Sequence, residues 1–326
     1  MRACSPGDEG RAKHLEALHG FNQGGKETLF ALTRSPDFDG FELIHQVKLL
    51  RLVANAQLYP SDFEESHRTS LRALEIAKRL GQEDQLVLCH RAVSVAASYL
   101  GLREEAIWHD EQILELAKRN GGWLMLENAY NGLTENRWTV GDFEGALEAA
   151  TAATDISTKA HDGEPLWPHL YNMSRINLDL GNLEEGMRFA SEGLRSTQRR
   201  SEDFGVSMFL GLMSRYHRLS GNVAAALATS REALTMRRKV GFRYWTLFAL
   251  QEVAAVLILM ERHREVATLL AVSRDTLTLR REPDDREFEA WVETVKGSLR
   301  EHVFEQAWAE GLAMNLDDAY RLAMGC

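Results

Sequence analysis

A forty-residue spacing runs through most of this chain and constrains its fold more than any other feature. Positions that lie forty apart share their character. One such column is small throughout: Ala54, Ser94, Thr134, Ser174, Ser214 and Ala254. The column one residue earlier is apolar: Val53, Val93, Leu133, Met173, Met213 and Val253. Self-similarity of this length is typical of stacked supersecondary units, none of which can bury its apolar face alone. The sequence therefore predicts a repeat protein.

Each repeat has the pattern of a helical hairpin, which is clearest over residues 123–160. An apolar helix is followed by a turn at Val140-Gly141-Asp142, a second helix and a break at His161-Asp162-Gly163. Glycine can take the left-handed conformation that ends a helix, and a following Asp or Asn can begin the next one. The turn glycine recurs at Gly101, Gly141, Gly181 and Gly221. It is missing at Ser61 and Glu261, so we expect less sharply defined turns there.

Small or medium residues also recur five places after each turn, where they would let the second helix approach the first. This column consists of Ala106, Ala146, Gly186, Ala226 and Val266. Together these patterns predict an all-α protein, a right-handed α-solenoid of helical hairpins with a period of about 40 residues.

Basic residues cluster where the second helices end, as in Lys78-Arg79, Lys118-Arg119, Arg199-Arg200 and Arg237-Arg238-Lys239. We interpret them as complementing the negative end of the helix dipole, worth about 0.3–1 kcal/mol each. The alternative is a nucleic-acid patch. That would require aromatic residues on the same face, and the pattern does not supply them.

The forty-residue pattern is weak at both ends of the sequence, which suggests that the chain has three segments. Residues 1–40 are expected to form N-terminal capping helices, residues 41–281 the repeat array, and residues 282–326 C-terminal capping helices. In the last segment a longer amphipathic helix is predicted around Phe288, Trp291 and Val295, and short helices follow it. Solenoids need such polar-faced terminators because the last repeat would otherwise expose its apolar face.

Composition excludes several classes of function. The net charge of -10 disfavours general attraction to nucleic acid or to an anionic membrane. No apolar stretch reaches the ~18 residues that a membrane span needs. The three cysteines, Cys4, Cys89 and Cys326, make no CxxC pair and leave one unpaired, which fits a reducing compartment. We therefore expect a cytoplasmic protein with no direct nucleic-acid or membrane partner.

The hairpins resemble tetratricopeptide repeats over residues 41–281, because an apolar-small pair precedes each Gly-Asp or Gly-Asn turn and alanine follows it. The longer period is similar to the C-terminal sensor arrays of bacterial signal-transduction ATPases of the LuxR and SARP regulator kind. The tail, Phe304-Glu305-Gln306-Ala307-Trp308-Ala309-Glu310-Gly311 with Ala313-Met314-Asn315-Leu316-Asp317-Asp318-Ala319, is similar to the tail that closes many of those chains. This resemblance implies a sensor or partner-docking role in bacterial signalling or transcription control.

No catalytic motif is complete. The segment Gly20-Phe21-Asn22-Gln23-Gly24-Gly25-Lys26-Glu27-Thr28 has the glycine and lysine spacing of a phosphate loop, but Glu27 stands where Mg²⁺ needs Ser or Thr. We interpret it as a turn between helices. The histidines form no HExxH pattern, no GxSxG occurs, and Cys89 has the apolar setting of a buried residue. The sequence therefore predicts neither an enzyme nor a cofactor or metal site.

Candidate binding residues come from the first helix of each hairpin, which lines the concave wall in tetratricopeptide arrays. Positions ten, six and three places before each turn share one helix stripe. The polar and aromatic members of this stripe in the central hairpins are Arg91, Asn131, Glu135, Trp138, Tyr171, Arg175, Arg215 and Arg218. Arginine binds carboxylates and phosphates in a bidentate manner, so we expect a groove for an acidic peptide or a small anionic ligand.

Two alternatives to this groove stay open. The stripe also fits a solvated helix face with ion pairs inside the array, and Trp138 and Tyr171 also fit packing between hairpins. For the whole chain we predict a non-catalytic scaffold for protein interaction or ligand sensing. The alternative function is a ligand-gated transcription regulator that acts with a separate ATPase or DNA-binding partner.

Overall fold

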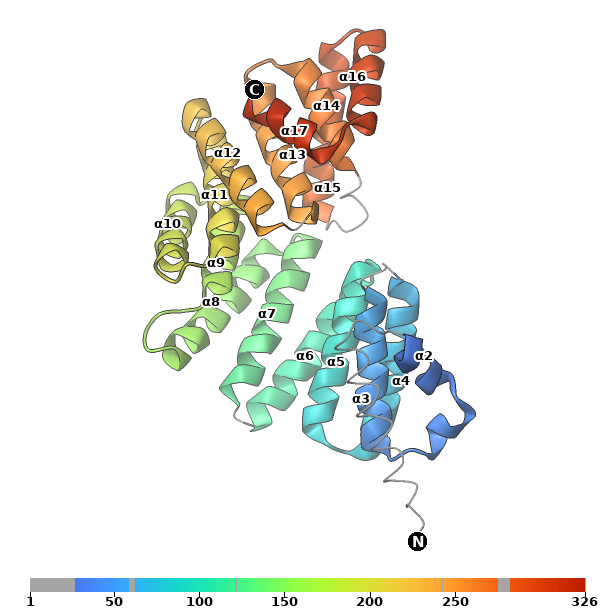
Figure 1. The fold of residues 1–326 in the computed structure, drawn as a ribbon. Helices are drawn as coiled ribbons and strands as arrows, with labels where there is room; N and C mark the ends of the chain where they lie inside the picture. Colours follow the sequence, from blue (N-terminus) through green and yellow to red (C-terminus); the bar gives the residue numbers. More distant parts are fainter. Residues whose placement is uncertain (1–26, 59–61, 121, 242, 275–281, 326) are drawn as a thin grey trace. The chain divides into compact units, whose positions relative to one another are not determined.

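The computed structural model describes residues 27–58, 62–120, 122–241, 243–274 and 282–325 (Figure 1). These residues form helices and no β-strand, so the predicted all-α class is confirmed. The chain divides into two compact units, Met1–Val140 and Gly141–Cys326, and each is described by itself below. The helix predicted at residues 11–18 and the glycine-rich part of the phosphate-loop-like segment lie outside the described residues.

The N-terminal unit is a stack of antiparallel helices in which each helix packs against the next along the chain. It begins with the short helix α2 (Glu27–Arg34) and a 3-10 turn η1 (Pro36–Gly40). The repeat helices follow: α3 (Leu43–Leu58), α4 (Phe63–Leu80), α5 (Glu83–Tyr99), α6 (Arg103–Asn120) and α7 (Trp123–Val140). Phe38, Leu49 and Val53 are buried in an apolar cluster that joins η1, α3, α4 and α5.

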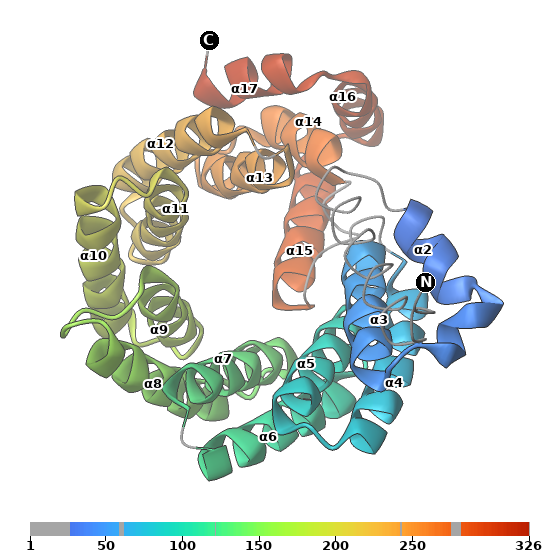
Figure 2. The same cartoon turned by 60° about the horizontal axis from the view of Figure 1, so that its bottom comes forward.

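The C-terminal unit continues the hairpin pattern and then departs from it. Its repeat helices are α8 (Phe143–Ala160), α9 (Trp167–Asp179), α10 (Leu183–Arg199), α11 (Asp203–Leu219), α12 (Val223–Val240), α13 (Arg243–Leu259) and α14 (His263–Ser273). Within this unit α9, α11 and α13 form one layer, and α10, α12 and α14 form a second (Figure 2). Three further helices end the chain: α15 (Glu282–Ser298), α16 (Glu301–Ala313) and α17 (Leu316–Met324).

The predicted glycine turns are present. Gly101, Gly181 and Gly221 have φ angles of 75°, 78° and 75°, in the left-handed region where a Cβ is disfavoured. After the Gly221 turn, Asn222 caps α12 by accepting a hydrogen bond from the backbone N–H of Ala225 at 3.2 Å. The expectation of a looser turn at Glu261 is wrong, because Glu261 itself takes φ 57° and the same turn closes. The stacking of α13 on α14 imposes this conformation on a residue that does not favour it.

Hydrogen bonds tie the two helices of several hairpins together where the small residues meet. The Ser174 hydroxyl donates to the carbonyl of Gly186 at 2.9 Å, and the Ser214 hydroxyl does the same to Ala226 at 2.9 Å. In the first hairpin the direction reverses, since Ser66 on the second helix donates to Ala54 on the first at 2.8 Å. The two small-residue columns thus meet face to face, as their spacing predicts.

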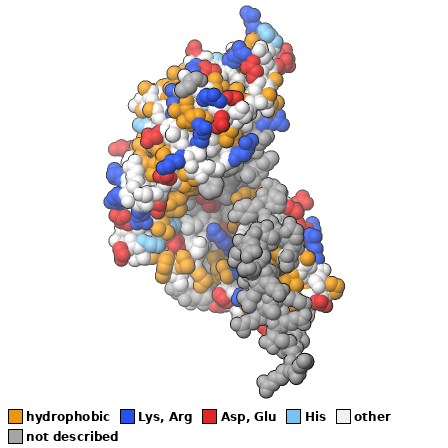
Figure 3. Space-filling model, viewed as in Figure 1, with side chains coloured by type: hydrophobic (Ala, Val, Ile, Leu, Met, Phe, Trp, Pro, Cys, Tyr) orange, Lys and Arg blue, Asp and Glu red, His pale blue; other side chains and the backbone are white. Residues whose placement is uncertain are grey.

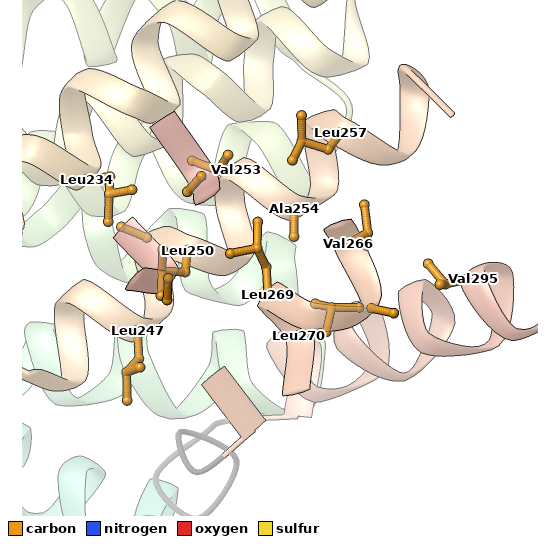
Figure 4. Close-up of a cluster of buried hydrophobic side chains, with 14 of the residues drawn as sticks. Leu234, Leu247, Leu250, Val253, Ala254, Leu257, Val266, Leu269, Leu270 and Val295 are labelled. Atoms are coloured by element: carbon orange, nitrogen blue, oxygen red, sulfur yellow. The ribbon is translucent and has the colours of Figure 1, made fainter. Parts of the chain in front are cut away.

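The terminal helices cover the apolar end of the C-terminal unit. Leu250, Val253 and Leu270 lie at the centre of a buried cluster that includes Val295 of α15 (Figure 4). Trp291, Phe304 and Trp308 pack against its edge, as the sequence predicts for a cap. Helix α16 lies along α14, and the Arg231 side chain donates to the carbonyl of Ala323 in α17 at 3.0 Å. The segment boundaries at residues 40 and 281 stay predictions.

The interpretation of basic residues as dipole partners is wrong for one of them. Arg238 and Lys239 are exposed, but Arg237 is 1% exposed and lies inside the C-terminal unit. Its guanidinium is 3.3 Å from the Glu252 carboxylate and donates to the carbonyl of Ser207 at 3.4 Å. A side chain at Gly211 would occupy this space, because a Cβ there would lie 2.6 Å from Glu252. The glycine is therefore needed to make room for the buried ion pair.

The face of the C-terminal unit that Figure 3 shows carries acidic and basic side chains interspersed with hydrophobic ones. Among the helices of the described residues, none combines the length and apolarity that a membrane crossing requires.

Candidate functional site

A basic cavity lies between the first helices of the N-terminal unit. It is open to solvent on one side, has a volume of about 530 Å³ and is bounded by α3, α4 and α5. Lys48, Arg51 and Arg91 supply its charge, and no carboxylate is among its described lining residues. Leu52, Leu58, Leu88, Ala92 and Val95 supply apolar walls. A concave site of this size with a few polar groups on apolar walls is typical of a ligand pocket.

The helix pattern explains why the three cations converge. Lys48, Arg51 and Asn55 are three and four residues apart on α3 and so share one face. Arg91 comes from α5, and its Nη1 donates to the backbone carbonyl of Asn128 at 3.0 Å, which orients the side chain. Burial lowers the pKa of the Arg51 guanidinium, while the negative charge of Asp84 acts in the opposite direction. An anion in the cavity would offset the solvation that Arg51 has lost.

A buried hydroxyl completes the lining of the basic cavity. Ser70 on α4 is fully buried, and its Oγ has no hydrogen-bond partner among the described residues. A buried polar group without a partner costs about 1–3 kcal/mol, so such groups are rare unless a water or ligand satisfies them. A bound molecule with a free acceptor or donor would supply the hydrogen bond that the Ser70 hydroxyl lacks.

The predicted residues of the N-terminal unit fall into two environments. Arg91 lines the basic cavity, and Asn131 and Glu135 are half-buried on α7. Trp138 is only 2% exposed, which agrees with the alternative of packing between hairpins. Lys48, Arg51 and Ser70 are not among the predicted site residues, although Lys48 and Arg51 lie one turn apart on α3 and Arg51 stands in the same stripe as Arg91.

The predicted residues of the C-terminal unit contact one another in pairs. Tyr171 lies edge-on to Phe209 with ring centroids 6.0 Å apart, and the Arg175 guanidinium is 5.8 Å from the Tyr171 ring. Arg175 also donates to the Asn172 side chain at 3.2 Å. The half-buried Tyr171 side chain thus packs between helices, and its place in a binding groove stays a prediction.

Arg215 and Arg218 of α11 share one carboxylate, in an arrangement that we call the arginine–glutamate cluster. Glu287 of α15 accepts from Arg218 at 2.5 Å and from Arg215 at 3.4 Å. Asp179 lies 3.8 Å from Arg215. The two arginine side chains are 15% and 19% exposed, so these ion pairs are partly screened from water. Arg215 thus forms one ion pair inside the array, with Asp179, and both arginines pair with Glu287 of the C-terminal segment, to which no signal in the repeat could have pointed.

The N-terminal unit also holds a polar network that the sequence analysis did not identify. The Asp110 carboxylate on α6 is fully buried and accepts from Ser94 at 2.8 Å and from Asn136 at 2.6 Å. Burial raises the pKa of Asp110 to about 6, against the lowering effect of those two hydrogen bonds. A Cβ at Gly132 would lie 2.5 Å from this carboxylate, so glycine there leaves room for the network.

Three histidines lie beside this network. His90 and His109 face each other with 2.7 Å between their Nδ1 atoms, and burial lowers the pKa of both to about 4. Glu105 is 3.0 Å from Nε2 of His67 and 3.8 Å from Nε2 of His109. No group of side chains suited to hold a metal ion is found among the described residues.

Replacing Asp110 by asparagine should remove a pH dependence from the stability of the protein. Because its folded pKa of about 6 lies above the unfolded value of 3.8, the protonated carboxyl favours the folded state at low pH. This contribution is lost as the pH rises through 6, and it amounts to ~2–3 kcal/mol at 1.36 kcal/mol per pKa unit. Asparagine carries no charge, and its one carbonyl oxygen can accept from Asn136 while its amide N–H donates to the Ser94 hydroxyl. Urea unfolding should show the variant gaining stability relative to the unaltered chain between pH 4 and 7.5; a constant difference would contradict this assignment.

The environment of Cys89 does not activate its thiol. Cys89 is fully buried, and burial raises the pKa of its thiol to about 11. A thiol in that state is not a nucleophile at neutral pH, because the thiolate is the reactive form. Cys89 thus fits the predicted role of a small buried residue.

The fold and the layers of helix pairs define a tetratricopeptide-like repeat array. Among solved structures, the chain is similar to NprR in complex with its cognate peptide NprX, with a TM-score of 0.62 and 13% identity over 98% of both chains. It is also similar to the apo form of RapI, with a TM-score of 0.59 and 12% identity over 98% of this chain and 100% of that one. A Rap protein complexed with competence and sporulation factor gives a TM-score of 0.55 and 14% identity, over 91% of this chain and 78% of that one.

No protein-family model matches the sequence, and no curated protein matches it. The identities to the solved structures are low, so these comparisons establish the fold. The resemblance to LuxR and SARP regulators stays a prediction.

Proposed function

We propose that this chain is a non-catalytic sensor of bacterial signalling that binds a peptide or small ligand with an anionic group in its basic cavity. The observation that carries the proposal is the convergence of Lys48, Arg51 and Arg91 on an apolar-walled cavity without a lining carboxylate. Arginine forks recognise carboxylates in a bidentate manner, and the apolar walls would receive hydrocarbon side chains. The ligand expected from this chemistry is a short acidic peptide with apolar residues.

The fold supports a binding role of this kind. NprR, of similar fold, was solved with its cognate peptide. Since function belongs to sites and not to folds, the argument depends on the residues of the cavity, and the fold adds an analogy. We expect the chain to act in the cytoplasm, through a protein partner that responds to the bound ligand.

Charge reversal in the basic cavity tests this proposal. The probe is a fluorescein-labelled peptide, Leu-Glu-Leu-Glu, with a free terminal carboxylate, and binding is followed by fluorescence anisotropy. The double variant Arg51→Glu with Arg91→Glu should bind at least about 100-fold more weakly, because charged hydrogen bonds contribute about 1.5–3 kcal/mol each. Binding to the unaltered chain should also weaken as salt increases.

A matched control reverses two exposed arginines of the same unit. Arg68 and Arg119 are 73% and 59% exposed, and each pairs only with a glutamate of its own helix in the described structure. The variant Arg68→Glu with Arg119→Glu changes the net charge equally and should bind the probe as the unaltered chain does. Equal loss in both variants would show a general charge effect and contradict a cavity site. Failure of the unaltered chain to bind this acidic peptide would contradict the proposed ligand class.

A further inference from the structure

The buried carboxylate of Asp110 lies on the helix next to the one that carries Arg91. Its helix, α6, packs against both α5 and α7 in the N-terminal unit (Figure 1). Ser94 of α5 donates to Asp110 at 2.8 Å and is about one helical turn from Arg91, which lines the basic cavity. One of the three cations of the cavity and a fully buried acid are therefore neighbours.

Helix α7 contacts both Arg91 and Asp110 along one face. Asn128, Gly132 and Asn136 are four residues apart and share this face. The Asn128 carbonyl accepts from Arg91 at 3.0 Å. The Asn136 amide donates to Asp110 at 2.6 Å, and a Cβ at Gly132 would lie 2.5 Å from the same carboxylate. The same face of α7 thus holds the Arg91 and Asp110 side chains in place relative to each other.

The charges around Asp110 make Arg91 its principal cation. Burial raises the pKa of Asp110 to about 6, the positive charge of Arg91 lowers it, and the negative charge of Glu111 on the same helix raises it. From α7, Asn136 is neutral, and the Arg137 guanidinium lies 3.9 Å from the Glu111 carboxylate. Among the described residues, the ionised form of Asp110 is therefore stabilised by the charge of Arg91 and by hydrogen bonds.

We propose that Asp110 couples ligand binding in the basic cavity to the uptake of a proton, so that the cavity holds an anion more tightly at lower pH. An anion that binds Arg91 offsets the positive charge that stabilises the ionised Asp110, and the carboxylate then takes up a proton more readily. By thermodynamic linkage, the chain with a protonated Asp110 binds the anion more tightly by the same factor. The inference rests on the proposed function, because it requires an anionic ligand in that cavity.

Asp110 acts in this scheme as a positioning residue. It is not among the described lining residues of the cavity, so it acts on the ligand through Arg91. At high pH the ionised Asp110 and the ligand compete for the charge of Arg91. At low pH the neutral carboxyl leaves that charge to the ligand, so affinity falls as the pH rises through about 6.

Calorimetric titration with an N-acetylated Leu-Glu-Leu-Glu peptide tests this coupling. The unaltered chain should bind the peptide about five-fold more tightly at pH 5.5 than at pH 8, because Asp110 changes its protonation in this range. At pH 6.5 about half a proton should be taken up per bound peptide, as measured from the heats in buffers of different ionisation enthalpy. Burial lowers the pKa of His90 and of His109 to about 4, so both are essentially neutral throughout.

Two variants isolate the contribution of Asp110. Asp110→Asn removes the titrating group, so the affinity should lose this five-fold dependence and the proton uptake should fall by about one half. The matched control, Glu111→Gln, removes a carboxylate from the adjacent position, where the side chain is 51% exposed, and should keep the pH dependence. Any contribution of His67 is common to all three chains.

A folded Asp110→Asn variant with the pH dependence of the unaltered chain overturns the inference and leaves the cavity site intact. Failure of the unaltered chain to bind the peptide contradicts the proposed function and the inference together. If Asp110→Asn does not fold, NMR titration of the Asp110 carboxyl carbon in the unaltered chain decides the question. Its midpoint should lie at higher pH with saturating peptide than without, and an unchanged midpoint in a chain that binds the peptide overturns the inference.

Discussion

Replacing Arg237 by alanine should lower the free energy of unfolding of the C-terminal unit by about 3–5 kcal/mol, because the Glu252 carboxylate would remain buried without its cation. Arg237 is almost fully buried, 3.3 Å from Glu252, and its guanidinium lies 5.5 Å from the Phe248 ring. Few surface substitutions change stability by more than ~0.5 kcal/mol. Urea unfolding followed by circular dichroism measures the difference.

The neighbouring residue provides the control for this prediction. Arg238 is 44% exposed and pairs with Asp317 at the surface, so Arg238→Ala should cost under about 1 kcal/mol. The double variant Arg237→Met with Glu252→Met removes both charges and should recover most of the loss. If Arg237→Ala unfolds at the same urea concentration as Arg238→Ala, the ion pair is not buried in solution.

Replacing Gly311 by valine should have the second large effect and lower the free energy of unfolding by about 3 kcal/mol. A Cβ at this position of α16 would lie 2.3 Å from the backbone carbonyl oxygen of Thr268 and 2.7 Å from the Cβ of Ala271. A backbone carbonyl cannot move aside as a flexible side chain can, so α16 would have to separate from α14. Thermal and urea unfolding both report this change.

Gly297 is the matched control for Gly311. It lies in α15, and a Cβ there would meet nothing within 4 Å. Gly297→Ala should therefore be neutral or stabilising by up to ~1 kcal/mol through helix propensity. Gly311→Val with the stability of Gly297→Ala would show that α16 does not pack closely on α14.

The period predicted the helices well because it reports which residues face a neighbouring hairpin. Ala146, Gly186 and Ala226 are buried where the columns place them, and the turn glycines have the expected conformation. The turn at Glu261 shows the limit of predicting a turn from its residue types. Local preference argues against a left-handed residue, but the stacking of the flanking helices decides its conformation.

The candidate site could be predicted only in part. Arg91 was identified because it occupies the repeating stripe, whereas Ser70 belongs to the second helix and has no pattern that distinguishes it. Glu287 lies beyond the last repeat, so no periodicity connects it to Arg215 and Arg218. Arg237 has the same surroundings in sequence as its exposed neighbours, and only the tertiary fold buries it. Contacts between distant segments carry no signal in a single sequence.

The contact between His90 and His109 restricts which ring nitrogens of the two histidines carry hydrogen. With 2.7 Å between two Nδ1 atoms, one ring must donate and the other must accept, so the two rings are opposite tautomers. Nε2 of His109 lies 3.8 Å from the Glu105 carboxylate, too far for a hydrogen bond, but the negative charge favours a hydrogen on that nitrogen and hence the acceptor role for Nδ1. His90 then carries its hydrogen on Nδ1, and its Nε2 is unprotonated. The Glu105 charge thereby favours, through one intervening ring, the tautomer of His90 in which Nε2 is the basic nitrogen.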